Sequence, residues 1–135
     1  HNGRHSFPTR RSSDLRADRQ AMAHRLGLDE VVVCAFAHHL THVRNLCAHH
    51  CRVWNRKLTL TMTLPKRPSV LATQFNASQD RRIYNTLVML VWCVRAISPD
   101  TTWPVRVRGL MGERTSDELR AMGAPEDWID RATWV

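Results

Sequence analysis

The chain contains no apolar run long enough to cross a membrane. Its longest such run, from Ile83 to Val94, is interrupted by Asn85 and Thr86. That run falls well short of the ~20 residues that a transmembrane helix requires. No secretory signal peptide is recognisable in the sequence either. We therefore expect a protein that neither spans nor binds a membrane.

Paired cysteine motifs are also lacking. The four cysteines show neither the CxxC spacing of a zinc ribbon nor the density of a disulfide scaffold; they are Cys34, Cys47, Cys51 and Cys93. Three of them lie in or beside apolar helical stripes, where a free cysteine behaves as a small hydrophobic residue. The cysteine pattern thus predicts a reducing, cytoplasmic environment and gives no sign of a zinc ribbon.

Acidic residues are scarce relative to basic ones. There are 12 Asp and Glu against 20 Lys and Arg, which gives a formal net charge of +8 and a sequence pI near 10.6. Such a balance favours an anionic partner, most often nucleic acid, although a basic surface that only maintains solubility has the same composition. Charge alone therefore leaves both interpretations open.

Residues 1–15 have no apolar periodicity and no helix caps, and position 1 is not methionine. The run from Phe7 to Leu15 resembles one reading frame of a sequencing-adapter oligonucleotide. We therefore expect residues 1–15 to be a non-native, disordered lead and exclude them from fold reasoning. The lead holds three arginines and one aspartate, so the remaining chain still has a net charge of +6.

The rest of the chain predicts one domain of helices. With 43% apolar and 24% charged residues, its composition is that of an ordinary globular protein. Apolar residues at spacings of three and four, together with Gly and Pro at the segment ends, indicate helices over 16–26, 30–54, 78–97, 103–111 and 117–122. We expect Ser78 and Ser116 to cap two of them, and Trp54, Trp128 and Trp134 to be packed.

Residues 55–77 differ from these segments because they contain Pro65, Pro68 and several threonines. The alternation from Thr59 to Leu64 has the period of a strand, but the sequence offers no partner strand. An extended loop is the better interpretation. The predicted fold class is therefore all-α, a small helical bundle with a long irregular loop between its two main helices.

The predicted helix over 30–54 concentrates polar side chains on one face. His38, His42, Asn45 and His49 follow at spacings of four, three and four. Arg44 lies five residues before His49, or about 140° around the helix, so the two flank that face. Three interpretations compete: a solvated helix face with a few core histidines, a metal site, and a metal-independent nuclease. The spacing of His38 and His42 suits zinc, but no glutamate follows His38 as in metalloproteases.

A longer string favours the third interpretation. The residues from Arg44 to His49 fit the Arg-x4–6-His motif of HEPN domains, and the string from Val43 to Arg56 resembles the RN-x-x-AHH-x-R-x-WNR signature of the Abi-like family of abortive infection proteins. The segment from Asp80 to Tyr84 and the ending from Met122 to Trp134 also resemble that family. The resemblance covers residues 16–135. Family members are roughly twice as long, so we expect a C-terminal helical domain whose N-terminal half is missing.

The resemblance implies a HEPN-like bundle and a ribonuclease that works without metal in phage defence. It assigns His49 as the general acid and base, Arg44 as the clamp on the transition-state phosphate, and Asn45 as the residue that orients His49 or binds phosphate. His50, Arg52 and Arg56 are candidates for contacts with the RNA backbone. A homodimer through the motif helix is also implied. The alternative is a non-catalytic HEPN-like module that binds RNA or protein.

Overall fold

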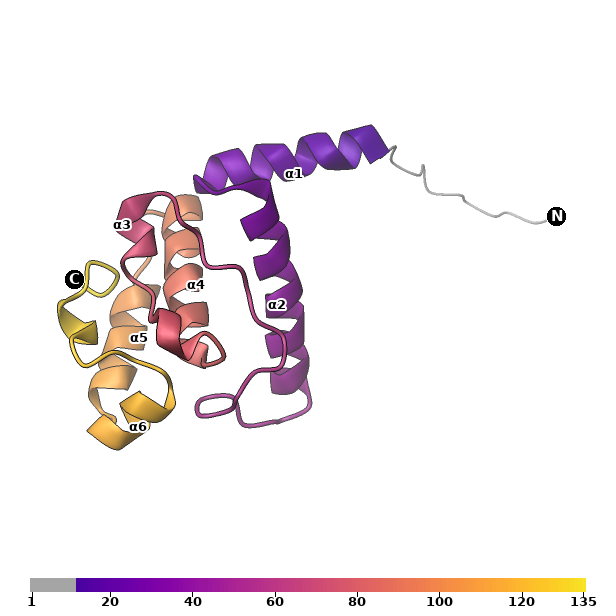
Figure 1. The fold of residues 1–135 in the computed structure, drawn as a ribbon. Helices are drawn as coiled ribbons and strands as arrows, with labels where there is room; N and C mark the ends of the chain where they lie inside the picture. The colour runs from indigo at the N-terminus through magenta and orange to yellow at the C-terminus, as the bar shows by residue number, and fades with distance from the viewer. Residues whose placement is uncertain (1–11) are drawn as a thin grey trace.

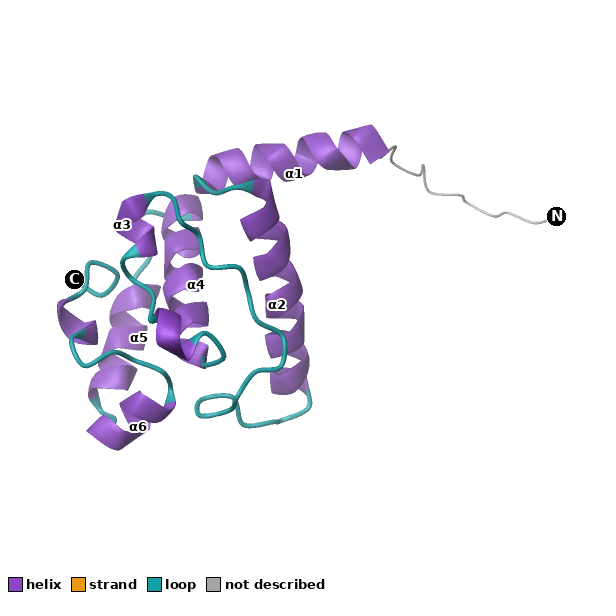
Figure 2. Cartoon of the chain, in the orientation of Figure 1, coloured by secondary structure: helices purple, strands orange, loops and turns teal. Residues whose placement is uncertain are grey.

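A computed structural model describes residues 12–135, with side chains from Leu15 onward; the first eleven residues of the expected lead lie outside the described part. Within residues 12–135 every regular element is a helix and no strand occurs, which confirms the all-α fold class (Figures 1 and 2). The elements are α1 (Ser12–Leu26), α2 (Glu30–Ala48), α3 (Ser69–Ala72), the short 3-10 turn η1 (Ala77–Gln79), α4 (Ile83–Ile97), α5 (Trp103–Gly112), α6 (Ser116–Ala121) and a second 3-10 turn, η2 (Trp128–Asp130). No helix in this range is long and apolar enough to cross a membrane.

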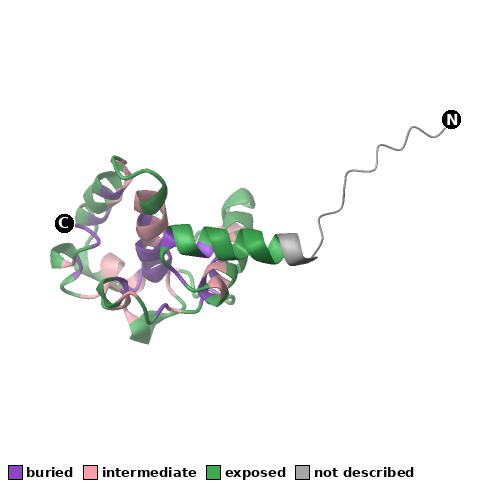
Figure 3. Cartoon of the chain, turned by 90° about the horizontal axis from the view of Figure 1, so that it is seen from above, coloured by how far each residue is buried: buried purple, intermediate pink, exposed green. Residues whose placement is uncertain are grey.

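Helix α1 lies across one end of α2 and α4, and most of its surface faces outward (Figures 1 and 3). It begins at Ser12, four residues before the expected start. It ends as the sequence predicts: Gly27 has φ +68°, and the backbone N–H of Leu28 returns to the carbonyl of Ala23 at 2.9 Å. The buried Ala23 and Leu26 attach this helix to the rest of the domain.

Helix α4 is the centre of the core. Tyr84, Val88, Met89 and Val91 are at most 1% exposed, as expected for a helix that is apolar around most of its circumference. It starts at Ile83, however, and not at Ser78. Arg82 has extended backbone torsions (φ −110°, ψ 158°) and serves as the N-cap, so the chain before it forms the separate turn η1.

The loop between α2 and α3 is part of the core. It runs between α2 and α4 (Figure 1), and its Leu58 and Met62 are 1% and 6% exposed. The sequence alternation from Thr59 to Leu64 forms no strand, in agreement with the prediction of an extended loop. The loop therefore contributes buried side chains to the space between the two long helices, while its threonines stay exposed.

The C-terminal third packs on α4 through its tryptophans. Trp128 and Trp134 are 5% and 3% exposed, which confirms the expected packing, and Trp134 Nε1 donates a hydrogen bond to Tyr84 Oη at 3.0 Å. Thr115, one residue before the expected cap Ser116, forms a capping box with Glu118 at the start of α6. At the end of α6, Gly123 has φ +88°, and a Cβ placed there would lie 2.6 Å from Cβ of Arg82.

Candidate nucleic-acid interface

The buried face of α2 is displaced from the one the apolar pattern predicts. Val32, Phe36 and His39 are the buried residues, and Leu40, Val43 and Leu46 pack partly against the core. The apolar spacing over 30–54 also places Ala37 and Cys47 on the predicted buried stripe, yet both are exposed. The buried face therefore includes a histidine and leaves two small residues of the predicted stripe in solvent.

His39 is a buried polar residue that the motifs in the sequence do not single out. Its side chain is 1% exposed; Nδ1 lies 2.6 Å from the carbonyl of Leu60, and Nε2 lies 2.7 Å from Thr86 Oγ1 on α4. Burial lowers the pKa of His39; the hydrogen bond with Leu60 raises it and the charge of His42 lowers it further. The interpretation of a few core histidines thus fits His39, whereas His38 is exposed.

The predicted helix over 30–54 ends six residues early, because α2 stops at Ala48. The backbone N–H of Cys51 bonds the carbonyl of Leu46 at 2.9 Å, and that of His50 bonds Cys47 at 3.0 Å. These two bonds form a Schellman motif. The residue in its left-handed position is His50, with φ 57°. No Gly or Pro marks this end, so sequence alone could not locate it.

The early end divides the expected site between a helix and a loop. Arg44 and Asn45 lie on the last turns of α2, and His49 is its C-cap residue, with φ −91°. His50, Arg52 and Arg56 follow on the irregular segment. Trp54, expected in the core as a continuation of the helical stripe, is 37% exposed. That prediction was wrong because the helical period on which it rested does not reach residue 54.

All six predicted site residues are exposed. Arg44 Nη1 donates to Asn45 Oδ1 at 3.4 Å, and the backbone N–H of His49 bonds the carbonyl of Asn45 at 3.1 Å. Within residues 12–135, the side chains of His49, His50, Arg52 and Arg56 form no hydrogen bond or ion pair. One chain thus pairs Arg44 with Asn45 and leaves the other four side chains without a hydrogen bond or ion pair.

The loop that carries these side chains is held by two arginines before α4. Arg82 Nη1 donates to the carbonyl of Asn55 at 2.7 Å. Arg81 Nη1 lies 3.4 Å from the carbonyls of both Leu58 and Thr59, and its own carbonyl accepts from the N–H of Leu58 at 2.8 Å. The segment from Asp80 to Tyr84, first noted only for its resemblance, therefore fixes the path of the loop.

The distribution of acidic residues along the sequence is a further signal for this surface. Between Glu30 and Asp80 there is no Asp or Glu, whereas six Lys and Arg and five His occur there. The cations are Arg44, Arg52, Arg56, Lys57, Lys66 and Arg67, and all of them are exposed. This acid-free segment gives the end of α2 and the following loop an uncompensated positive charge, which attracts polyanions.

The described side chains do not form a metal site. Across residues 12–135 no three or more His, Cys, Asp or Glu side chains are placed to hold an ion together. His42, one of the candidates, instead lies with Nε2 3.4 Å from Thr59 Oγ1. Cys34 and His38 are both exposed. The geometry thus offers no support for the zinc interpretation.

Comparison with protein-family models finds a match over part of the chain. A family model described as "Abi-like protein" matches residues 9–55, which include α1, α2 and the string from Arg44 to Asn55. Its first seven residues fall in the lead that the sequence led us to exclude, and the adapter origin of that lead remains a prediction. No curated protein and no solved structure matches the chain. The match supports the Abi-like family for this chain, and it rests on residues 9–55.

Proposed function

We propose that this chain is the RNA-cleaving part of an abortive infection protein and that it cleaves without metal through Arg44 and His49. The Abi-like family suggests a role in abortive infection, a form of phage defence. The observation that carries the proposal is the exposed, acid-free end of α2, where His49, Arg52 and Arg56 have no protein partner. Free cations on a surface without acids favour phosphate as the partner.

The chemistry requires two proton transfers and one fixed positive charge. The 2′-oxygen of a ribose attacks the adjacent phosphorus, and the bond from phosphorus to the 5′-oxygen of the next nucleotide breaks. A 2′,3′-cyclic phosphate and a 5′-hydroxyl result. The imidazole of His49 suits proton transfer near neutral pH. The guanidinium of Arg44 suits the charge on the phosphate oxygens, because it stays protonated and binds them in a bidentate fork.

The separation of Arg44 and His49 along α2 supports a site shared by two copies of the chain. Arg44 lies on the last turns of α2 and hydrogen-bonds Asn45, whereas His49 is the C-cap residue and its side chain forms no hydrogen bond within one copy. If the ends of two α2 helices face each other, the arginine of one copy and the histidine of the other approach a common phosphate. A second histidine then supplies the second proton transfer. We therefore propose a homodimer through α2, with Asn45 holding Arg44 in position.

A cleavage assay in EDTA tests the mechanism. We expect the chain to cut single-stranded RNA and to leave 2′,3′-cyclic phosphate ends. Arg44→Ala should lower the rate by about 10²-fold or more, as loss of one transition-state donor does. His49→Ala should lower it by about 10²- to 10⁴-fold. Matched controls are His38→Ala on the same helix and Arg106→Ala on α5, both at exposed positions, which should retain full activity.

Two results would contradict the proposal: cleavage that stops when EDTA is added, or cleavage that survives both Arg44→Ala and His49→Ala. Asn45→Ala should lower the rate less than Arg44→Ala, because it loses only the positioning of the guanidinium. Analytical ultracentrifugation of the same variants measures dimer formation separately from the rate of RNA cleavage.

A second candidate function is a non-catalytic RNA-binding module, which is favoured by the exposed Arg52 and Arg56, cations that form no hydrogen bond or ion pair in the described chain. Its cations would bind the phosphate backbone, and His50, Arg52 and Arg56 would contribute affinity only. RNA with 2′-O-methyl groups separates the two functions, because it can be bound but lacks the attacking hydroxyl. Tight binding of that RNA, together with no cleavage of unmodified RNA, would support the binding function and contradict the catalytic one.

A further inference from the structure

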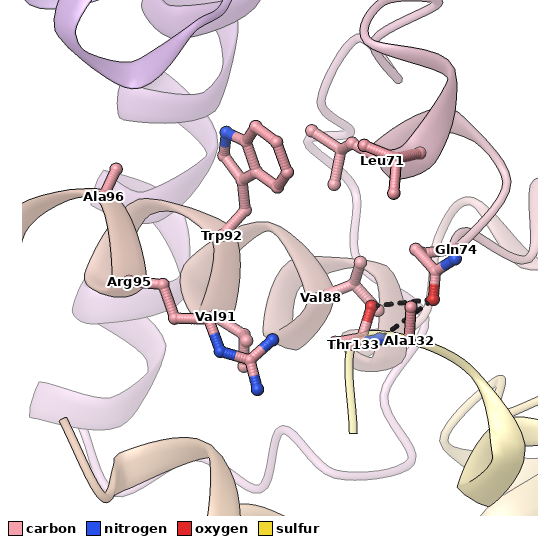
Figure 4. Close-up of a pocket in the computed structure, with 10 residues that line it drawn as sticks. Leu71, Gln74, Val88, Val91, Trp92, Arg95, Ala96, Ala132 and Thr133 are labelled. Carbon is pink, nitrogen blue, oxygen red and sulfur yellow. Dashed lines mark hydrogen bonds between the residues drawn. The ribbon is translucent and has the colours of Figure 1, made fainter. Parts of the chain in front are cut away.

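A cavity of about 300 Å³ lies on the side of the domain formed by α3, α4 and the C-terminal segment (Figure 4). Its apolar lining comes chiefly from Leu71, Val88, Val91 and Trp92. None of the residues in the acid-free segment that were proposed to bind RNA lines it. The volume is at the lower end of the range for small-molecule sites, which are typically apolar with a few placed polar groups.

The polar groups of this cavity are satisfied, with one exception. Gln74 Oε1 accepts from the N–H and Oγ1 of Thr133 at 3.0 and 3.1 Å, as the dashed lines in Figure 4 show. Trp92 Nε1 donates to the carbonyl of Leu26 at 2.8 Å. The exception is Arg95, which is half-buried and forms no hydrogen bond or ion pair within the described chain.

An unpaired guanidinium beside an apolar cavity favours a negatively charged ligand. Arg95 lies in the last turn of α4, where the helix dipole favours a cation, yet its N–H donors have no acceptor in the protein. A half-buried cation is best compensated by an anion that binds both forks of the guanidinium, as a carboxylate does. The rest of such a ligand must be apolar, because the remaining lining offers no free polar group.

We propose that this cavity binds a small amphipathic carboxylate, with its apolar body between Leu71 and Val91 and its carboxylate on Arg95. The site is separate from the end of α2 and does not depend on the proposed nuclease activity. Binding there would link α4 to α3 and to the C-terminal segment, because all three contribute lining residues.

Calorimetric titration of the 135-residue chain with octanoate and with octanol tests the proposal. The two probes share their apolar chain and differ in charge. We expect octanoate to bind roughly tenfold more tightly, the effect of one charge-assisted hydrogen-bonded pair. Arg95→Gln should remove that preference, while Arg106→Gln on α5, an exposed position outside the cavity, should retain it.

A second variant locates the site. Ala132 lines the cavity at an exposed position, so Ala132→Trp should fill the space without disturbing the core and weaken both probes. In amide and indole NMR spectra of the parent chain, octanoate should shift the indole signal of Trp92 and leave that of Trp54 unchanged. Absence of octanoate binding would overturn the proposal. Equal binding of the two probes, or unchanged octanoate binding by Ala132→Trp or Arg95→Gln, would overturn it as well.

Discussion

His39 on α2 and Thr86 on α4 are joined through a side-chain hydrogen bond of 2.7 Å between Nε2 and Oγ1 in the buried core. The other ring nitrogen lies 2.6 Å from the carbonyl of Leu60. A carbonyl oxygen can only accept, so Nδ1 carries the hydrogen and Nε2 accepts from the threonine hydroxyl. This one neutral imidazole connects both long helices to the loop between them.

The first prediction concerns the pH dependence of stability. Burial lowers the pKa of His39 in the folded protein, whereas the unfolded chain titrates near the ordinary value of about 6.5. As the pH falls below that value, the unfolded state binds the proton first, so stability decreases until the folded pKa is reached. The free energy of unfolding in urea should therefore fall by up to about 1.4 kcal/mol per pH unit from this proton.

The variant His39→Gln isolates this effect, because it removes the titrating group while keeping polar atoms that can bond Leu60 and Thr86. Its unfolding free energy should vary less with pH than that of the parent chain. The control is His38→Gln at the exposed neighbouring position, which should keep the parent slope. Identical slopes for the parent and His39→Gln would show that His39 does not titrate differently on folding.

The second prediction concerns the left-handed residue at the end of α2. A non-glycine residue in this conformation costs about 1–2 kcal/mol, and His50 has φ 57°. His50→Gly should stabilise the domain by about 0.5–1 kcal/mol, since part of the gain is offset by the flexibility of glycine in the unfolded chain. His50→Val should destabilise it by about 1 kcal/mol or more, because β-branched residues strongly disfavour this region. Chemical denaturation measures the stability of both variants. If His50→Val were more stable than His50→Gly, the backbone at residue 50 would not be strained.

A third prediction compares two glycines. Gly123 combines φ +88° with a Cβ position 2.6 Å from Cβ of Arg82, whereas nothing lies within 4 Å of a Cβ at Gly109 on α5. Gly123→Ala should destabilise the domain by about 2 kcal/mol or more, through backbone strain and displacement of Arg82. Gly109→Ala should stabilise it by about 0.5–1 kcal/mol, because alanine is the better helix former. Thermal unfolding distinguishes them by the sign of the change in Tm.

The fourth prediction concerns thiol reactivity. Burial raises the pKa of Cys93 to about 11, and only the thiolate reacts with alkylating agents. Near pH 8, its thiolate fraction is about 10²-fold below that of a thiol with an ordinary pKa. Mass spectrometry after brief exposure to iodoacetamide should find label on the exposed Cys34 and Cys47 and none on Cys93. Equal labelling of Cys93 would mean that α4 is not packed as described.

Much of this fold could be predicted from the sequence. The sequence indicates the central α4 because its residues are apolar around most of the helix circumference. Gly27 and Gly123 mark the ends of α1 and α6 because glycine readily adopts a positive φ. Ends without such residues could not be found. The end of α2 depends on His50 adopting a glycine-like conformation, and the start of α4 depends on Arg82, whose side chain is fixed by a contact with Asn55. The first depends on a rare local backbone conformation and the second on a tertiary contact, and neither is visible in the sequence.

The candidate site was predicted in part. The six candidate residues Arg44, Asn45, His49, His50, Arg52 and Arg56 are all exposed. The sequence predicts a helix through residue 54, but α2 ends at Ala48, so His50, Arg52 and Arg56 lie on the irregular segment that follows. The burial of His39 has a signal in the sequence, because His39 follows Val32 by seven residues and Phe36 by three, the spacing of one helix face, whereas His38 does not share that spacing. The direction in which His39 faces is set by the packing of Val32 and Phe36 on the core.

The turn at His50 also has a mechanical consequence. Arg44 lies on α2, whereas Arg52 and Arg56 follow the left-handed residue His50 on the irregular segment. That segment is held at both ends, by the turn at His50 and by the hydrogen bond from Arg82 to the carbonyl of Asn55. The backbone that carries Arg52 and Arg56 therefore has a set position relative to Arg44 before any ligand is present.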